Sequence, residues 1–177
     1  MKIMPAQTGA ALDDFITLAH EYVTWMLAEI QVRYPELDIR EFTSEHAYDD
    51  LRKKFPGGHV PPDGGLLLAT IDGRVGGCIA LGRLSPEICE VRTLYVRPQF
   101  RGTGVGAELV SAVLDQARGL GYRCARLDTL AFMTSAQRLY RAQGFYDIAP
   151  YLDMSESLKH YICFLELKLS DGGTKSL

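Results

Sequence analysis

The stretch of sequence that decides the fold is Gln99-Phe100-Arg101-Gly102-Thr103-Gly104-Val105-Gly106-Ala107. The preceding segment, 88–96, is rich in β-branched and aromatic residues, which is typical of a strand. In the following segment the apolar residues recur at helical spacing until a pair of glycines near position 119: Leu109, Val110, Val113, Leu114 and Ala117. A strand, a glycine-rich turn and a helix in this order begin a β-α-β unit, which requires parallel strands.

Further strands are expected on both sides of this unit. The segments 66–71 and 74–84 read as two strands joined by Asp72-Gly73, a dipeptide suited to a tight hairpin turn. Downstream we expect a strand at 124–129, a helix at 134–143 and a final alternating strand at 161–169. The sheet is therefore predicted to be mixed, antiparallel at first and parallel at its centre.

Two helices are predicted near the N-terminus. Apolar residues at helical spacing indicate an amphipathic helix over 10–31, and a second helix can begin at Ser44-Glu45. The segment 59–65 contains two prolines and two glycines, which favour a loop. We therefore expect a single α/β domain spanning 1–177, with a mixed, mostly antiparallel sheet flanked by helices.

Composition excludes several classes of function. The formal net charge of -3 offers no general attraction to nucleic acid. No apolar run is long enough to span a bilayer, so a soluble, cytoplasmic protein without membrane contact is expected. The histidines and cysteines are scattered without metal-ligand spacing, so no metal is expected and the cysteines are predicted to be reduced.

The three glycines at 102, 104 and 106 can form an anion site. The first turn of a helix has backbone N–H groups without partners, and glycines let the backbone approach a phosphate closely. The alternative is a plain strand-to-helix connection. The loop lacks the Gly-Lys-Ser/Thr ending of a P-loop, and GxGxG differs from the dinucleotide fingerprint GxGxxG.

The loop resembles the cofactor signature of the GNAT superfamily of N-acetyltransferases, Q/R-x-x-G-x-G/A, which 99–104 matches as Gln-Phe-Arg-Gly-Thr-Gly. A second motif of that family, A-x-x-L-Y-x-x-x-G-F, is matched by 136–145. The resemblance covers about 66–169. It implies an acceptor-side region at 1–65, a cofactor-binding core at 66–169 and a flexible tail at 170–177.

The resemblance implies that acetyl-CoA is the acetyl donor. In such proteins the strand that enters the motif splays from its neighbour and pairs with the pantetheine arm, while the loop N–H groups hold the pyrophosphate. The residues implied in cofactor binding are Leu94, Tyr95, Val96, Gln99, Arg101, Gly102, Thr103, Gly104, Val105, Gly106, Ala107, Ser135 and Tyr140. Met133 departs from the family pattern, which often has an asparagine there.

Two residues are candidates for proton transfer. Glu90 resembles the glutamate that several family members use as a base, usually through water; the alternative is an exposed glutamate paired with Arg92. Tyr140 matches the family's general acid; the alternative is a core aromatic residue with a locally satisfied hydroxyl. Direct attack of the amine in a ternary complex needs no nucleophile from Cys124 or Ser135.

The expected activity is acetyl transfer to a primary amine of a small molecule. A non-catalytic acyl-CoA-binding module and an acetyltransferase for protein or peptide amines are the alternatives, and either a monomer or a homodimer is compatible with the sequence. The acceptor pocket is expected between the N-terminal helices, the loop at 56–65 and the segment after Gly144. Its candidate residues are Tyr22, Trp25, Tyr48, His59, Asp147, Tyr151 and Asp153.

Overall fold

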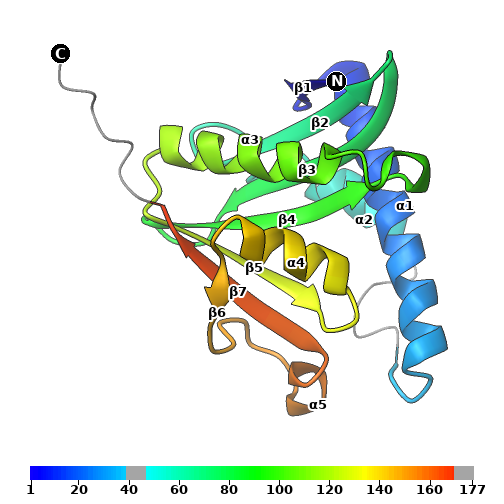
Figure 1. Ribbon diagram of the computed structural model, residues 1–177. Helices are drawn as coiled ribbons and strands as arrows, with labels where there is room; N and C mark the ends of the chain where they lie inside the picture. Colours follow the sequence, from blue (N-terminus) through cyan, green and yellow to red (C-terminus); the bar gives the residue numbers. More distant parts are fainter. Residues whose placement is uncertain (39–46, 170–177) are drawn as a thin grey trace.

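The computed structural model describes residues 1–38 and 47–169, which form a seven-stranded sheet with helices on both faces (Figure 1). The strands are β1 Lys2–Pro5, β2 Gly65–Ile71, β3 Arg74–Arg83, β4 Ile88–Val96, β5 Cys124–Leu130, β6 Tyr146–Asp147 and β7 Ile162–Lys168. The helices are α1 Gly9–Arg33, α2 Ala47–Lys54, α3 Val105–Gly119, α4 Thr134–Ala142 and α5 Glu156–Lys159, with a 3-10 turn η2 at Pro98–Phe100.

The strand order is β1-β2-β3-β4-β5-β7-β6, and β4–β5 is the parallel pair among otherwise antiparallel neighbours. The predicted mixed, mostly antiparallel sheet is thereby confirmed. The parallel pairing is short: it runs from Ile88 opposite Cys124 to Glu90 opposite Arg126 and then stops. Beyond Glu90 the two strands part, so the edge of β4 that faces β5 is left without a strand partner.

A β-bulge in β4 accompanies this separation. Cys78 of β3 is opposite Tyr95, whereas Ala80 is opposite Arg92, so β4 contains one residue more than β3 over this interval. Thr93 lies inside the bulge with a φ of 54°, a left-handed conformation that is uncommon for a β-branched residue. A bulge bends its strand and increases the local twist, which directs the end of β4 away from β5.

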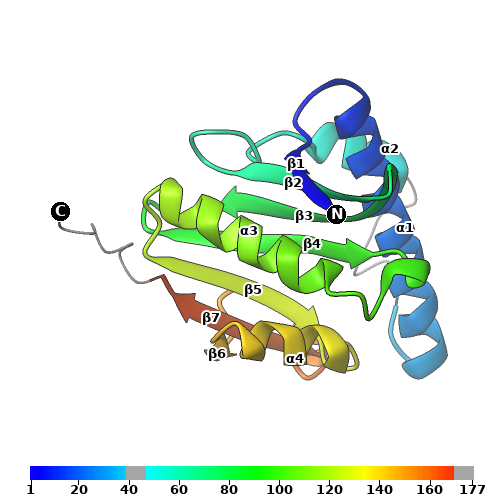
Figure 2. The same cartoon turned by 45° about the horizontal axis from the view of Figure 1, so that its top comes forward.

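Helices cover the two faces of the sheet separately (Figure 2). On one face α3 packs on a core that includes Leu109, Val113 and the β4 residues Cys89 and Val91. On the other face α1 packs on a second core that includes Phe15 and Tyr95. The alternation of β4 side chains thus assigns Cys89 and Val91 to the α3 face and leaves Glu90 and Arg92 on the face of α1 and α2.

Helix α1 is tied to the end of β4 by an ion pair. The Arg97 guanidinium contacts the Glu21 carboxylate at 2.6 Å and also donates to the carbonyl oxygen of Val75 at 2.8 Å. A guanidinium that bonds a carboxylate through two of its nitrogens fixes orientation as well as distance. This pair places the middle of α1 across the opening between β4 and β5.

The predicted long elements are present with shifts of one or two residues at their ends. Three short elements, β1, β6 and α5, are absent from the sequence prediction because two to four residues carry no readable periodicity. The predicted start of the second helix at Ser44-Glu45 and the predicted flexible tail at 170–177 lie outside the described residues.

Candidate functional site

The glycine-rich loop presents an open row of backbone donors at the start of α3. Among the described residues, no backbone carbonyl accepts a hydrogen bond from the N–H groups of 102–107. Gly102 and Gly104 have φ values of 77° and 90°, which favour glycine. A Cβ atom at Gly104 would meet no other atom within 4 Å, so the space beside it is free for a ligand. Unpaired donors at a helix N-terminus suit a phosphate.

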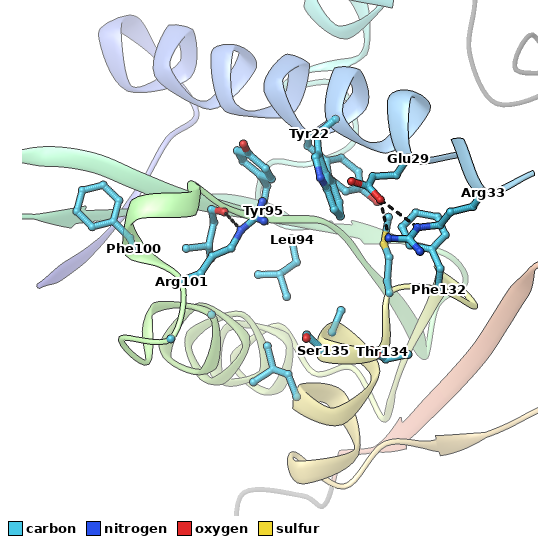
Figure 3. A pocket seen from close by; sticks show the side chains of 17 residues that line it. Tyr22, Glu29, Arg33, Leu94, Tyr95, Phe100, Arg101, Phe132, Thr134 and Ser135 are labelled. Carbon is cyan, nitrogen blue, oxygen red and sulfur yellow. Dashed lines mark hydrogen bonds and ion pairs between the residues drawn. The ribbon is translucent and has the colours of Figure 1, made fainter. Parts of the chain in front are cut away.

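A cavity of about 590 Å³ continues from this loop between α1 on one side and the starts of α3 and α4 on the other (Figure 3). The free edge of β4 forms one wall. The residues that line the cavity are Tyr22, Trp25, Glu29, Arg33, Leu94, Tyr95, Val96, Phe100, Arg101, Gly102, Gly106, Phe132, Met133, Thr134, Ser135, Ala136 and Leu139. An arm that carries amides can pair with the exposed N–H and C=O groups of such a strand edge.

Arg101 lines the cavity beside the glycine-rich loop. Its Nε donates to the carbonyl oxygen of Val96, and its guanidinium lies 5.2 Å from the ring centre of Trp25 and 5.8 Å from that of Tyr95. Cation–π contacts of this kind are worth about 0.5–1 kcal/mol at exposed sites. The side chain is therefore held weakly, next to the loop that suits an anion.

The cavity extends along the C-terminal half of α1, from the predicted residues Tyr22 and Trp25 to three that the sequence reasoning missed, Glu29, Arg33 and Phe132. Glu29 and Arg33 form an ion pair at 2.9 Å, and the Arg33 guanidinium lies 5.1 Å from the ring centre of Phe132. Trp25 packs edge-on against Phe132 as well. The spacing of 22, 25, 29 and 33 places these side chains on one face of α1, and that spacing is the signal that could have identified them.

The residues predicted to bind the cofactor divide into two groups. Seven line the cavity: Leu94, Tyr95, Val96, Arg101, Gly102, Gly106 and Ser135. Six do not: Gln99, Thr103, Gly104, Val105, Ala107 and Tyr140. For the loop members of the second group, the backbone rather than the side chain faces the anion site, since Val105 is buried in the core and Thr103 donates its hydroxyl to the Phe100 carbonyl at 2.7 Å.

Tyr140 projects from α4 and is only 6% exposed. Among the described residues the Tyr140 hydroxyl has no hydrogen-bond partner. The one side-chain N or O atom in that part of the chain that is both fully enclosed and without a partner is Gln116 Oε1. The Tyr140 hydroxyl is therefore not fully enclosed and keeps contact with solvent-accessible space. Burial, followed by the charges of Tyr22 and Asp128, raises the pKa of Tyr140 far above its usual range, so the hydroxyl stays protonated.

Glu90 is nearly fully buried, in contrast to the exposed position considered from the sequence. Its Oε2 accepts a hydrogen bond from Arg92 at 2.8 Å, and its Oε1 accepts one from the Tyr151 hydroxyl at 2.9 Å. Burial and the neighbouring Glu90 charge raise the pKa of Tyr151 far above its usual range. Both carboxylate oxygens of Glu90 are thus already engaged by the protein.

The structure places the acceptor-side candidates in different surroundings. Tyr22 and Trp25 face the cavity, Tyr151 contacts Glu90, and His59 approaches the Pro56 carbonyl oxygen at 3.1 Å. Asp147 forms an exposed ion pair with Arg141 at 2.8 Å, and Asp153 is exposed. The side chain of Tyr48 lies outside the described residues.

Comparisons with known proteins agree on one family. A model described as the acetyltransferase (GNAT) family matches residues 24–145. An uncharacterized N-acetyltransferase of Schizosaccharomyces pombe is 35% identical over 142 residues, which cover 79% of each chain. No helix among residues 1–38 and 47–169 has the length and apolar character needed to cross a membrane.

Solved structures of low sequence identity share the fold. An acetyltransferase from Streptococcus agalactiae superposes with a TM-score of 0.70 at 18% identity, covering 95% of this chain and 98% of that one. A Salmonella typhimurium protein described as an acetyltransferase, and solved with its cofactor acetyl-CoA, superposes with a TM-score of 0.68 at 17% identity, covering 99% of this chain and 97% of its own.

Proposed function

Because this chain belongs to the acetyltransferase (GNAT) family and is an acyltransferase, we propose that it transfers an acetyl group from acetyl-CoA to a primary amine of a small molecule. The reaction proceeds by direct attack in a ternary complex. Acetyl-CoA supplies the activated thioester, and the residues of this chain bind it, orient it and move protons. Holding two reactants together in this way can lower the barrier by about 7–11 kcal/mol.

The observation that carries the proposal is the opening between β4 and β5. Pairing stops at Glu90 and Arg126, and the free edge of β4 then leads along the cavity to the open N–H groups of 102–107. The pantetheine arm would pair with Leu94 and Val96, and the pyrophosphate would accept from the loop N–H groups. The acetyl-CoA bound to the structural neighbour from Salmonella typhimurium supports this use of the site.

Tyr140 is the proposed general acid. Its hydroxyl stays protonated because its pKa is raised, and it retains contact with accessible space, as a proton donor to a departing thiolate requires. The sequence predicts Glu90 as the base. Because Glu90 is 5% exposed and both its oxygens accept hydrogen bonds from Arg92 and Tyr151, it would act on the amine indirectly, by orienting or relaying to the group that takes the proton.

Two other functions are distinguishable from this one. A non-catalytic acyl-CoA-binding module would bind the donor without turnover. An acetyltransferase for protein amines would acetylate a peptide N-terminus or a lysine side chain and leave small amines unchanged. The aromatic wall formed by Tyr22, Trp25 and Phe132 favours a small acceptor.

The test has a binding stage and a turnover stage. Acetyl-CoA should raise the melting temperature, because a ligand selective for the folded state stabilises it by mass action. Free thiol should then be released when a panel of small primary amines is added, and less with model peptides. A thermal shift without thiol release from any amine or peptide would favour the binding module, and absence of a thermal shift would contradict the cofactor assignment.

A further inference from the structure

We propose that Asp128, on β5 just beyond the point where β4 and β5 part, accepts the proton of the acceptor amine. This inference rests on the proposed acetyl transfer and names a proton acceptor that the sequence motifs do not indicate. It assigns to Glu90 the role of a positioning residue on the same face of the sheet.

The strand register places Asp128 at the opening. The last β4–β5 pair joins Glu90 to Arg126, and Asp128 follows two residues later, so its side chain is on the same face as that of Arg126. Leu127 and Ala125 point to the opposite core, where α3 packs. Asp128 therefore faces α1 and α2 at the place where the sheet no longer closes.

Three polar groups on the elements around the opening lack a hydrogen-bonding side-chain partner. Among the described residues, no side chain donates a hydrogen bond to the Asp128 carboxylate, although its own backbone N–H reaches it. The hydroxyls of Tyr22, which is half-buried, and of Tyr140, which is 6% exposed, have no hydrogen-bond partner in that part of the chain either. None of these atoms is fully enclosed, so each keeps contact with space in which water or a ligand can bind it.

These three groups lie within electrostatic reach of one another. The charge of Asp128 contributes to the raised pKa of Tyr22 and also to that of Tyr140, whereas the Glu90 charge contributes to neither. Tyr22 lines the cavity from α1 (Figure 3). Of the two carboxylates on this face, Glu90 belongs to the last β4–β5 pair, whereas Asp128 lies two residues beyond Arg126, where the strands have parted.

Glu90 and Asp128 differ in what holds them. Glu90 lies where the strands are still paired, is 5% exposed, and already accepts one hydrogen bond at each oxygen, from Arg92 and Tyr151, so little of its carboxylate is open to an amine. Asp128 is partly exposed and has no such bond to break. An amine can therefore reach Asp128 at a lower cost.

The surroundings of Asp128 make its carboxylate more basic. Burial raises the pKa of its carboxyl group, Arg92 opposes this and Glu90 adds to it, and Lys54 lowers it weakly. The titratable groups that interact electrostatically with Asp128 are Tyr22 on α1, Lys54 on α2, Glu90 and Arg92 on β4, Tyr140 on α4, and Tyr151 in the segment after β6. A carboxylate with a raised pKa removes a proton from an ammonium group more readily.

The proton transfers balance over one cycle. The ammonium form of the acceptor gives one proton to Asp128, and the freed nitrogen pair forms the new C–N bond as the C–S bond breaks. The sulfur leaves with the C–S electron pair and takes the proton of Tyr140, whose oxygen recovers one from the nitrogen. The products are the amide and the free thiol, and Asp128 releases its proton to solvent.

The same surroundings predict how stability depends on pH. Because the pKa of Asp128 is higher in the folded state than in the unfolded chain, the folded state binds more protons between the two values, and stability falls as pH rises through that window. Asp128→Asn removes this loss of stability, because an amide does not ionise as pH rises. The variant should therefore be more stable than wild type at pH 8, and the gain should disappear in acid, below the unfolded pKa.

The experiment compares Asp128→Asn, Glu90→Gln and the surface control Asp115→Asn, since Asp115 is exposed on α3. The full-length protein is assayed with acetyl-CoA against a panel containing phenylethylamine, putrescine and free amino acids, and the acetylated amines are followed from pH 6 to pH 10. We expect Asp128→Asn to lower kcat/KM at pH 7 by roughly 100-fold or more, with a smaller deficit at pH 10, as for loss of a general base. Glu90→Gln should lose roughly tenfold or less, in keeping with a positioning role.

Two results would overturn the assignment. One is a larger loss of kcat/KM in Glu90→Gln than in Asp128→Asn, which would make Glu90 the group that accepts the proton. The other is lower stability of Asp128→Asn than of wild type at pH 8, which would make Asp128 a structural residue. If the wild type binds acetyl-CoA but acetylates no member of the panel, the proposed function fails. The stability of Asp128→Asn relative to wild type at pH 8 still decides whether the Asp128 charge lacks a compensating partner.

Discussion

Arg101 donates a hydrogen bond from its Nε to the carbonyl oxygen of Val96 at 2.9 Å. Val96 ends the free edge of β4, where a pantetheine arm would pair with the backbone. In the structure, the Arg101 side chain therefore occupies an acceptor that the proposed cofactor needs. Its guanidinium also lies over the ring of Trp25.

Acetyl-CoA binding should consequently move Arg101 away from Trp25. Trp25 is the only tryptophan of the chain and lines the cavity beside Arg101 and Phe132, so its fluorescence reports on this part of the site. We expect a change of emission when acetyl-CoA is titrated into the wild type and a smaller change in Arg101→Ala. Saturation of the protein, measured by thermal shift, with no change of emission would contradict displacement of the guanidinium.

Gly104→Ala should weaken acetyl-CoA binding by tenfold or more, or about 1.4 kcal/mol. The added Cβ would enter free space beside the loop donors, and the φ of 90° would be strained. Gly121→Ala is a matched control, because Gly121 has a φ of 84°, meets no atom within 4 Å and lies after α3, away from the loop. Both variants should lose similar stability, and equal affinities for acetyl-CoA would place the cofactor elsewhere.

Tyr140→Phe should leave acetyl-CoA affinity nearly unchanged and lower kcat by roughly 100-fold, within the range for loss of one general acid. The ring contact with Phe145, at 5.7 Å between centroids, is available to phenylalanine as well, so the fold should persist. Because the raised pKa keeps Tyr140 protonated, the wild-type rate should show no alkaline fall from its ionisation. A kcat of Tyr140→Phe equal to that of the wild type would mean that water, and not Tyr140, donates the proton to the thiolate.

Glu90→Gln should cost about 1 kcal/mol or less of stability, since an amide retains most of the hydrogen bonding and the Arg92 partner is 40% exposed. Glu90→Ala should cost more, because the Tyr151 hydroxyl and Arg92 would both lose their acceptor. Urea unfolding of the two variants measures the difference. Equal losses would mean that the hydrogen bonds contribute little beyond the charge.

Tyr146→Phe should destabilise the protein at neutral pH by about 0.5–1.5 kcal/mol, the usual net contribution of a hydrogen bond, because Tyr146 is 41% exposed and solvent weakens its bond to a charged group. The Tyr146 hydroxyl donates to Glu166, and this bond, with that of Arg126, lowers the pKa of Glu166. Such a contribution exists above the unfolded pKa and is lost as pH falls through the folded one. The difference between variant and wild type should therefore shrink in acid, and a constant difference from pH 7 to pH 3 would refute the link to Glu166.

The β-α-β unit and its loop were readable from the sequence because their signals are local. The strand at 88–96, the glycines at 102, 104 and 106 and the helical spacing after Val105 each lie within a few residues of the element that they specify. The glycine requirement also has a local cause, since φ values near 80–90° at Gly102 and Gly104 are a property of single residues. The placement of an anion site at the start of α3 follows from the same short stretch.

Tertiary structure decided which side chains meet at the opening between β4 and β5. The bulge at Thr93 and the end of pairing at Glu90 depend on contacts between strands, and they leave Glu90 enclosed and Asp128 open. The ring contact of Trp25 with Phe132 joins residues separated by more than half the chain, and no periodicity encodes it. A periodic pattern determines which face of its own element a residue occupies, whereas the packing of α1 across the splayed strands determines its neighbours.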